Sequence, residues 1–554
     1  MQNEITDVGT PSITKSEWRV IIAASLGAVF EWYEFFLYGA LAAVIAAQFF
    51  SGLDDTSGFI FALLAFAAGF VVRPIGALVF GRLGDLVGRK YTFMLTILVM
   101  GGSTVAVGFL PSYSAMGIAA PIILIALRML QGLALGGEYG AAATYVAEHA
   151  PRGKRGEFTS YIQLTSTVGL LLSLLVIVIS RQWTGADFDT WGWRIPFLFS
   201  GLLLVISVYI RSSMHESPAF KRIKSEGKIS KAPLSEAFGQ WRNLKLVLSS
   251  LFGLLAGQAV VWFTALFYSM FFLTQTLKVD VSTTNLLVAL ALIITAPMYI
   301  MIGKLSDKVG RKPLILGGCL LAALTIFPIF HALTKYANPA LAIAQEKAPI
   351  VVTTNPGDCS FQFNPTGAAS FTSSCDVARR VMAANAASYS TSDDVSKSVT
   401  TVRIGETVIT SPSLKTLSAA EAKLAELEFR TSVGKALSQA GYPLKADPEA
   451  INKPMVLLLL VILMFYGAMA LGPMGAIMVE MFPTRIRYSA MSLPYHLGNG
   501  WFGGLLPTLC FALVAQNGSI YAGLWYPVIV AAASFAIGAI FVTDKRNCDL
   551  SADD

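Results

Sequence analysis

Charged side chains are scarce in this chain of 554 residues. Asp, Glu, Lys and Arg make up 14% of it, and histidine occurs four times. Soluble domains carry about a quarter of their residues as charged types, whereas 55% of this chain is hydrophobic. This composition excludes a soluble protein of this length. The sequence also has no nucleotide-binding P-loop, no paired-histidine metal motif and no nucleophile elbow. We therefore expect neither an enzyme nor a bound metal or other cofactor.

Long apolar runs take the place of the missing charge. About twenty apolar residues can cross the hydrocarbon core of a membrane as a helix, and runs of this kind recur along the whole chain. The sequence predicts an all-α polytopic membrane protein with twelve transmembrane helices in two pseudo-symmetric six-helix bundles. The runs lie near 19–48, 57–80, 91–110, 118–146, 158–180, 195–211, 246–274, 285–303, 314–333, 455–478, 488–515 and 521–542.

A repeated loop relates the two halves. GRLGDLVGRK at 81–90 returns as GKLSDKVGRK at 303–312, an offset of 222 residues. A weaker repeat, EHAPRGKRG from Glu148 and EMFPTRIRY from Glu480, has an offset of 332 residues. A repeat at a fixed offset marks a duplicated structural unit. The difference of 110 residues therefore indicates an insertion in the second half, and apolar character is lost there between about 335 and 453.

Lys and Arg gather in alternate loops, and short loops rich in them stay cytoplasmic. This predicts that both termini are cytoplasmic and that the insertion faces outward. The net charge of +7 is thus mainly a topology signal, and we expect no nucleic-acid partner. The expected segments are a cytoplasmic tail 1–18, the first bundle 19–211, a cytoplasmic linker 212–245, the first part of the second bundle 246–334, an extracytoplasmic inserted domain 335–453, the rest of that bundle 454–542 and a cytoplasmic tail 543–554.

The insertion is long enough to fold. Residues 414–440 have the pattern of an amphipathic helix, with Ser418 and Glu421 as a capping box and Leu417, Leu424 and Leu427 on one face. Cys359 and Cys375 are the two cysteines expected outside the membrane on its oxidising side. We expect a disulfide between them; the alternative is two free thiols. An outward disulfide favours a bacterial inner membrane.

Charges inside the apolar runs carry the functional signal. Glu31, Glu34 and Tyr38 share one face of the first helix, and Arg128 lies with Gln131 on one face of the fourth. A charge at the bilayer centre costs at least about 2.5 to 3.5 kcal/mol, so each is expected to face a partner or water. If Arg128 pairs with Glu34, a proton that neutralises the acid frees the arginine for an anionic substrate. The alternative is a structural ion pair that joins two helices.

These motifs resemble those of the major facilitator superfamily. Within it, EWYEFFLYG at 31–39, RPIGALVFGRLGDLVGRK at 73–90, LQGLALGGEYGAAATYVAEHAPR at 130–152 and WGWRIPF at 191–197 resemble the metabolite:proton symporter family. That family includes carriers of shikimate, proline and betaine, citrate and 2-oxoglutarate. The resemblance covers nearly the whole chain except the insertion. In that family the second carboxylate of the pair in the first helix is commonly an aspartate, whereas this chain has Glu34.

The resemblance implies two bundles that rock about a central cavity lined by helices one, four, seven and ten. Proton coupling would involve Glu34, Arg128 and Glu31. Arg73 is expected near the cytoplasmic rim or against backbone carbonyls. The substrate would meet residues from the four lining helices, namely Tyr38, Arg128, Gln131, Gln258, Trp262, Tyr268 and Tyr466.

The repeated loops are expected to act as a gate. Acids can cap helix starts, where backbone amides favour them, and the basic residues can meet acids such as Glu148. These contacts would hold the cytoplasmic side shut and break when it opens. The alternative is that the charges only fix topology. The gating residues would be Asp85, Arg89, Lys90, Glu148, Asp307, Arg311 and Lys312.

The sequence thus favours a proton-coupled symporter that takes up a small organic acid or zwitterionic metabolite. Its partners would be this substrate, protons and the lipid bilayer, and the protein is expected to be a monomer. An exporter of anionic compounds would share the same motifs. A membrane sensor that uses the inserted domain is a further alternative. A buried His496 in the eleventh helix is a candidate proton relay or a structural hydrogen-bonding group. The substrate itself is left open by the sequence.

Overall fold

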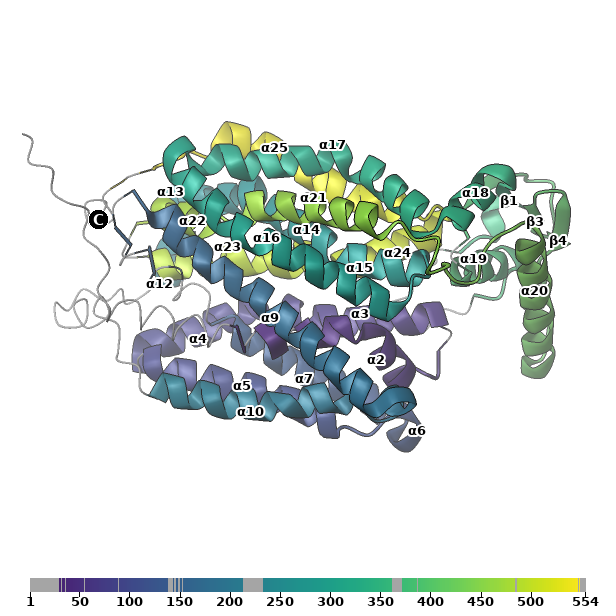
Figure 1. Ribbon diagram of the computed structural model, residues 1–554, viewed down its shortest axis with the longest axis horizontal. Helices are drawn as coiled ribbons and strands as arrows, with labels where there is room; N and C mark the ends of the chain where they lie inside the picture. The colour runs from purple at the N-terminus through teal and green to yellow at the C-terminus, as the bar shows by residue number, and fades with distance from the viewer. Residues whose placement is uncertain are drawn as a thin grey trace, which may run out of the picture.

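The computed structural model describes residues 29–212, 233–360, 371–483 and 486–548, apart from positions 31, 35, 54, 88, 138–142, 144–145, 148–149, 152, 386 and 547. Most of these residues form long helices that run side by side (Figure 1). Helices satisfy every backbone hydrogen bond within themselves, as hydrocarbon surroundings require. The C-terminal residues lie at one end of the bundle, called here the terminus end, and the insertion lies at the other, the insert end (Figure 1).

The N-terminal half opens with a helical segment, Trp32–Ala40, that bends into α2. The second span is interrupted at Val72, and α4 begins at Arg73 with Pro74 in its first turn, where proline is well tolerated. The helices of this half are α2 Ala42–Phe49, α3 Asp55–Val71, α4 Arg73–Val87, α5 Arg89–Phe109, α6 Tyr113–Met116, α7 Ala119–Leu135, α9 Arg155–Thr184, the 3-10 turn η1 Gly185–Phe188 and α10 Arg194–Ser212.

The C-terminal half contains several wide π-helical segments, three of them in its first long helix. The expected linker contains α12, which begins at Pro233. The elements are α12 Pro233–Gly239, α13 Trp241–Ser250, η2 Leu251–Leu255, α14 Ala256–Phe263, η3 Thr264–Tyr268, α15 Ser269–Phe271, η4 Phe272–Thr276, α16 Val281–Val309, α17 Arg311–Ala337, α21 Lys453–Leu471, α22 Met474–Met481, α23 Arg487–Leu497, η6 Gly498–Gly503, α24 Leu506–Asn517, η7 Ala522–Leu524 and α25 Trp525–Phe541.

Eight helices within the described residues are long and apolar enough to cross a membrane, and the bent pair at the start of the chain would make a ninth. Three shorter apolar helices lie among them, at Met94–Phe109, Ala119–Leu135 and Arg194–Tyr209. A polytopic, largely helical protein follows from these elements.

The insertion departs from the expected all-α class. It contains a four-stranded sheet of order β2-β1-β3-β4, in which β1 and β2 are parallel and the other neighbours antiparallel. Ile350 pairs with both Tyr389 and Ile404. The all-α expectation is therefore wrong for this part of the chain. Its elements are α18 Pro339–Lys347, β1 Ile350–Thr354, the 3-10 turn η5 Pro356–Asp358, α19 Ser374–Ala384, β2 Tyr389–Asp393, β3 Thr401–Ile404, β4 Thr407–Thr410 and α20 Ala419–Gln439.

The helix expected within 414–440 is α20, and Ser418 and Glu421 form its capping box. The expected apolar face does not bury itself, because Leu424 and Leu427 are 60% and 59% exposed. A disulfide joins Cys359 to Cys375, the pairing inferred from the sequence. It ties η5 to the start of α19.

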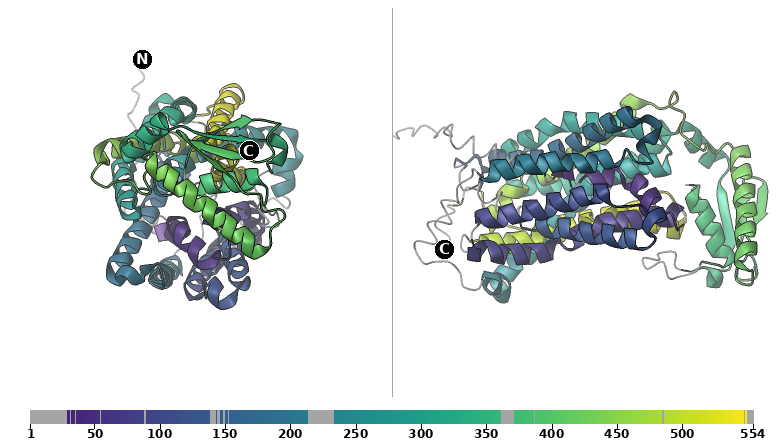
Figure 2. Two further views of the ribbon diagram at one scale, coloured as in Figure 1. Left: turned by 90° about the vertical axis from the view of Figure 1, so that its right-hand side faces the viewer. Right: turned by 90° about the horizontal axis from the view of Figure 1, so that it is seen from below.

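The two halves pack against each other along α9 and α16 and along α4 and α23 (Figures 1 and 2). Gly156 and Gly303 let the two helices of the first seam approach closely, because a Cβ on either glycine would press on the other's backbone. The insertion packs on the ends of both halves, because α19 contacts α3 and α24. Figure 2 shows it as a cap over the insert end.

Candidate functional site

Glu34 and Arg128 are both buried inside the N-terminal half, at 4% and 1% exposure. The link that the structure shows between them runs through neutral side chains. The guanidinium of Arg128 donates to Oε1 of the Gln131 side chain, and Nε2 of the same side chain donates to the Thr104 hydroxyl. Thr104 Oγ1 in turn donates to Glu34 Oε2 over 3.2 Å. Helix one, α5 and α7 therefore meet at one polar chain in an apolar interior.

Tyr38 covers one side of this series of hydrogen-bonded side chains. Its ring lies under the guanidinium of Arg128, with Cζ 3.9 Å from the ring centroid, a cation–π arrangement that stabilises a desolvated cation. The Tyr38 hydroxyl donates to the carbonyl oxygen of Ala62 in α3 over 3.1 Å. The ring of Tyr38 stacks on Phe66 at 6.1 Å, which continues the site toward the C-terminal half.

From the sequence, Arg73 was expected near the cytoplasmic rim or against backbone carbonyls. It lies inside the span Ile60–Phe80, is 2% exposed and has its guanidinium 4.0 Å from the centroid of the Phe70 ring. Trp32 of the first helix is 5.8 Å from it. Two buried arginines, Arg73 and Arg128, thus face the aromatic middle of the molecule.

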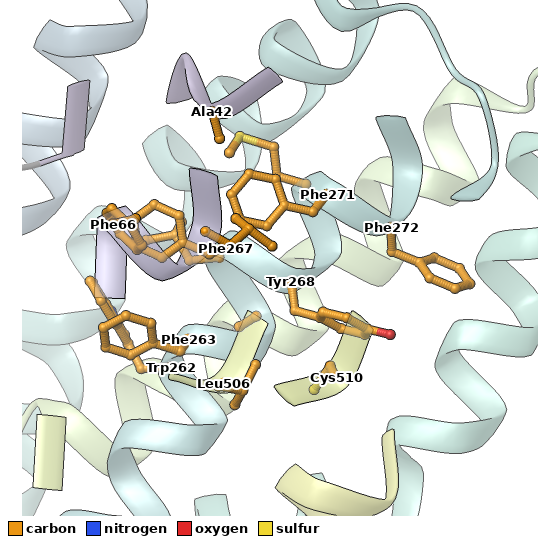
Figure 3. Close-up of a cluster of buried hydrophobic side chains, with 14 of the residues drawn as sticks. Ala42, Phe66, Trp262, Phe263, Phe267, Tyr268, Phe271, Phe272, Leu506 and Cys510 are labelled. Carbon is orange, nitrogen blue, oxygen red and sulfur yellow. The ribbon is translucent and has the colours of Figure 1, made fainter. Parts of the chain in front are cut away.

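An aromatic cluster joins the halves at this depth. Trp262 of α14 meets Phe36 of the first helix at 5.8 Å, and its indole N–H donates to the Tyr299 hydroxyl over 3.1 Å. Phe66 packs on Phe267 at 5.3 Å (Figure 3). Gln258 lies one turn before Trp262; its amide is fully buried, and neither its oxygen nor its nitrogen has a hydrogen-bond partner among the described residues.

Two other expected substrate contacts lie elsewhere. Tyr268 packs among Phe330 and Phe511, 5.6 Å from each, and Figure 3 shows its ring turned toward Cys510 and away from Phe66 and Trp262. Tyr466 accepts a hydrogen bond from Thr325 of α17 over 3.2 Å. Both side chains therefore face neighbouring helices of the C-terminal half.

His496 is 2% exposed, and neither ring nitrogen has a hydrogen-bond partner among the described residues. Its ring lies edge-on to Tyr495 at 5.4 Å. It belongs to α23, the helix that packs on α4 across the boundary between the halves.

The second repeated loop joins the halves at the terminus end. Asp307 accepts hydrogen bonds from the backbone N–H groups of Gly156 and Glu157, at 2.8 and 2.9 Å, and so caps the start of α9. Arg311 lies 2.8 Å from Asp307 and donates twice to Glu480, at 3.1 and 3.2 Å. We call Asp307, Arg311, Glu480 and Arg155 of the N-terminal half, which is 3.6 Å from Glu480, the terminus-end latch.

Neighbouring residues support the latch. Lys312 donates to the carbonyl oxygens of Ala539 and Val542 at the end of α25. Neither of these two bonds is to an acidic side chain. Asp544 caps α17 by accepting from the backbone N–H of Arg311 at 2.6 Å. Arg155 donates to the Cys548 carbonyl oxygen over 2.9 Å.

Several predicted site residues lie outside the described part of the chain. Glu31 and Glu148 are not described. Asp85 falls in α4, and Arg89 and Lys90 fall in the first turn of α5, but their side chains are not described. The first repeated loop therefore cannot be compared with the second at the level of contacts.

Sequence reasoning missed Thr104, Asp544 and the role of Arg155. Thr104 had a signal, since a hydroxyl in an apolar run needs a partner. Glu480 had one too, because it is the repeat counterpart of Glu148, which was expected to meet the basic residues of a repeated loop. Asp544 is one of four aspartates in the polar C-terminal tail and gave no signal.

The repeat, the two helical halves and the buried charges have known counterparts. The sequence profile of the Major Facilitator Superfamily matches residues 21–392. The chain belongs to the major facilitator superfamily. A second profile, "Sugar (and other) transporter", matches residues 434–551. The family consists of transporters, which agrees with the expectation that this protein is not an enzyme.

Curated relatives narrow the comparison. The chain is 38% identical to the shikimate transporter of Escherichia coli K12 over 336 residues, which cover 59% of this chain and 75% of the relative. It is 34% identical to a putative proline/betaine transporter of Staphylococcus aureus over 330 residues, 57% of this chain and 69% of the relative. The fold resembles the proton:xylose symporter XylE of E. coli, with a TM-score of 0.62 at 15% identity over 96% of this chain and 97% of that one.

Proposed function

We propose that this major facilitator transporter is a proton-coupled symporter that takes up a small organic acid or zwitterionic metabolite across a bacterial inner membrane. Twelve helices would span the bilayer, with both termini in the cytoplasm and the insertion outside. The relatives named above act on shikimate or on proline and betaine. These are small molecules with a carboxylate, which suits a site built around buried arginines.

The observation that carries the proposal is the buried chain from Glu34 to Arg128. An ionised carboxylate in an apolar interior is costly unless it is hydrogen-bonded and compensated by a positive charge. Protonation of Glu34 removes its negative charge from the surroundings of the Arg128 guanidinium, which makes an added anion more favourable there. A substrate carboxylate that enters then restores the balance, so protonation and substrate binding favour each other.

The C-terminal half would supply the rest of the substrate site. The free amide of Gln258 offers one donor and one acceptor, and Trp262 offers an apolar face next to it. Arg73 brings a second positive charge to the same depth. Tyr268 and Tyr466 are not part of this proposed site, because they face other helices.

The terminus-end latch would be the gate. Its charges come from both halves, so separating the halves at this end breaks the cap on α9 and the contact between Arg155 and Glu480. Substrate release on this side requires that separation, since alternating access exposes one side at a time. We assign the same role to the first repeated loop, with Asp85, Arg89, Lys90 and Glu148, on the strength of the repeat alone.

The test measures internal pH in proteoliposomes of the purified protein while shikimate, proline, betaine, citrate or 2-oxoglutarate is added outside. We expect one compound to acidify the lumen. Glu34→Gln should abolish the acidification, because the amide cannot take up a proton. Glu346→Gln, an exposed glutamate of α18, is the matched control and should behave as wild type.

The other outcomes are equally informative. Alkalinisation of the lumen on addition of an external compound would mean exchange for protons and would favour the exporter considered from the sequence. No pH change with any compound, despite intact reconstitution, would refute proton coupling for this panel. Acidification that persists in Glu34→Gln would refute the role assigned to that carboxylate.

A further inference from the structure

A short polar tail follows α25 and crosses the terminus-end latch. The tail residues that the structure describes are 543–546 and 548, and we call them the tail strap. None of them has a large apolar side chain, and Thr543, Lys545 and Arg546 are exposed. Burial of apolar surface, which holds most segments of a protein in place, therefore contributes little here. The tail strap is held by hydrogen bonds.

Asp544 fixes one end of the tail strap to the C-terminal half. Its carboxylate accepts hydrogen bonds from the backbone N–H groups of Arg311 and Lys312, over 2.6 and 3.1 Å, at the start of α17. The unpaired amides of a first helical turn favour an acid in this position. The side chain of Arg546 donates to the Lys308 carbonyl oxygen near the end of α16. These bonds hold the tail strap against the second repeated loop.

Cys548 carries the tail strap across the boundary between the halves. Its backbone N–H donates to the Lys545 carbonyl oxygen over 3.1 Å, which turns the chain. Its own carbonyl oxygen accepts from Arg155 Nη1 of α9 over 2.9 Å, and its thiol lies 3.9 Å from the Glu480 carbonyl oxygen of α22. Since α9 belongs to the N-terminal half and α22 to the C-terminal half, one tail residue contacts both halves.

The tail strap gives Arg155 a hydrogen-bond acceptor. The Arg155 side chain is 8% exposed and lies 3.6 Å from Glu480, a distance at which the charges attract but no good hydrogen bond forms. Its Nε is buried without a hydrogen-bond partner among the described residues. A buried guanidinium is costly when its donors are unpaired. The carbonyl oxygen of Cys548 therefore stabilises the closed arrangement, in which Arg155 is buried.

Separation of the halves at this end must break the bond between Arg155 and Cys548 or pull the tail off the second repeated loop. Either step exchanges hydrogen bonds within the protein for hydrogen bonds to water, which costs far less than leaving the groups unpaired. Neither step exposes a large apolar side chain of the tail. The tail strap can therefore leave and return while the bundle stays folded.

We propose that the tail strap is an autoinhibitory restraint on the gate. When it is bound, it holds the terminus end shut; when it is released, that end opens more easily. It acts in addition to the terminus-end latch, whose charges stay in place when the tail leaves. The inference rests on the proposed function only in taking the terminus end as a side that opens, and it requires neither proton coupling nor a particular substrate.

The test follows the opening of the terminus end with a thiol that lies outside the tail strap. Thr159 of α9 is buried and packs across the boundary on Gly475 of α22, where an added Cβ would lie 3.0 Å from the threonine Cβ. Thr159→Cys in a Cys548→Ser background should therefore react with a maleimide only when the halves separate. The other cysteines are buried or form the disulfide. The alkylation rate is measured on the purified protein in nanodiscs, without substrate.

A chain that ends at Lys545 keeps the cap that Asp544 forms on α17 and loses the acceptor of Arg155. We expect it to raise the alkylation rate of Thr159→Cys about tenfold or more, the loss of one hydrogen bond to a charged group. Arg546→Gln, which releases the tail from α16, should raise the rate as well. Lys545→Gln removes the same charge from the neighbouring exposed side chain and, as the matched control, should leave the rate unchanged.

A second background identifies the contact through which the tail strap acts. Arg155→Met removes the donor to the Cys548 carbonyl oxygen and keeps a side chain of similar length. Two changes that break the same contact are not additive. In this background the truncation at Lys545 should therefore change the alkylation rate by no more than about twofold.

Two results would overturn the proposal. One is a wild-type alkylation rate in the chain that ends at Lys545. The other is an equal rise on truncation in the Arg155→Met background, because the tail would then act through another contact. Thermal unfolding of each variant, at the wild-type midpoint, separates an opened gate from a lost fold.

The latch variant Asp307→Asn distinguishes a failure of this inference from a failure of the proposed gate. A rise in its alkylation rate without one in the truncated chain refutes the tail strap and leaves the gate. Wild-type rates in both refute the gate as well. Neither outcome bears on the proton coupling, which is tested at Glu34, because no substrate or proton gradient is present.

Discussion

A single substitution that preserves the side-chain shape of Asp307 should open the terminus-end latch. Asp307→Asn removes the negative charge that caps α9 and meets Arg311, and replaces one of the two accepting oxygens by a donor. The Asp307 side chain is only 7% exposed, so water screens these contacts little. Hydrogen bonds to charged groups contribute about 1.5 to 3 kcal/mol each. A loss of about 2 to 3 kcal/mol moves the balance toward the opened state by roughly 30- to 150-fold.

The chain carries its own reporter of this opening. Among its five cysteines, Cys359 and Cys375 form the disulfide, Cys319 and Cys510 are buried, and Cys548 alone is partly exposed. Its carbonyl oxygen accepts from Arg155 of the opposite half. Separation of the halves therefore uncovers the Cys548 thiol, and its alkylation rate by a maleimide should follow the population of the opened state.

We expect Asp307→Asn to raise the alkylation rate of the solubilised protein at least tenfold, and Glu480→Gln to do the same. Asp393→Asn, an exposed aspartate in β2, should leave the rate unchanged. Cys548→Ser should remove the labelling altogether. Wild-type rates in both latch variants would refute the reasoning, because they would mean that these contacts do not hold the halves together.

Three further predictions concern the insertion. Cys359→Ser should destabilise it by about 3 kcal/mol, as expected for a disulfide that closes a loop of this length; faster limited proteolysis would show it, and an unchanged rate would contradict it. Gly518→Ala should lower hydrogen-exchange protection in β2, because its Cβ enters the ring of the first residue of that strand; Gly441→Ala, equally left-handed but in open space, separates this clash from backbone strain. Hydrogen bonds from Ser418 lower the pKa of Glu421. The first turn of α20 should therefore keep its hydrogen-exchange protection until the pH falls below the ordinary glutamate range, and Glu421→Gln should remove this pH dependence.

The helical framework was predictable because hydrocarbon leaves few alternatives to a helix of about twenty residues. The sheet of the insertion was not predicted, although it had signals. IVVTT at 350–354 is rich in β-branched residues, and β3 and β4 are separated by only Gly405 and Glu406, a typical two-residue hairpin. These strands are only four or five residues long. Which strand pairs with which depends on contacts between residues far apart in the sequence, because α19 lies between β1 and its neighbour β2.

The site was predictable in its charges and less so in its geometry. Glu34 and Arg128 stood out because lipid penalises both, but Thr104 joins them only through the rotation and depth of a third helix. Tyr268 was expected to meet the substrate only because of the helix to which it belongs. In the structure its ring packs between Phe330 and Phe511. The π-helical segments of this helix, among them η3 with Tyr268 itself, were not predicted from the sequence.

The contacts between the halves are charged at the terminus end and apolar at the insert end, so the free-energy cost of opening has a different origin at each end. At the terminus end, Arg155 of the N-terminal half and Glu480 of the C-terminal half are both buried, with side-chain exposures of 8% and 1%. Removing one partner of such a pair costs about 3 to 5 kcal/mol, whereas water that enters between the halves hydrates both partners together. That end can therefore open cooperatively. At the insert end, α19 contacts both α3 and α24, and Ile60 from one half and Phe511 from the other line a common cavity. Opening there exposes apolar surface unless the insertion moves with one half, so the insertion adds a cost to the opening on its own side.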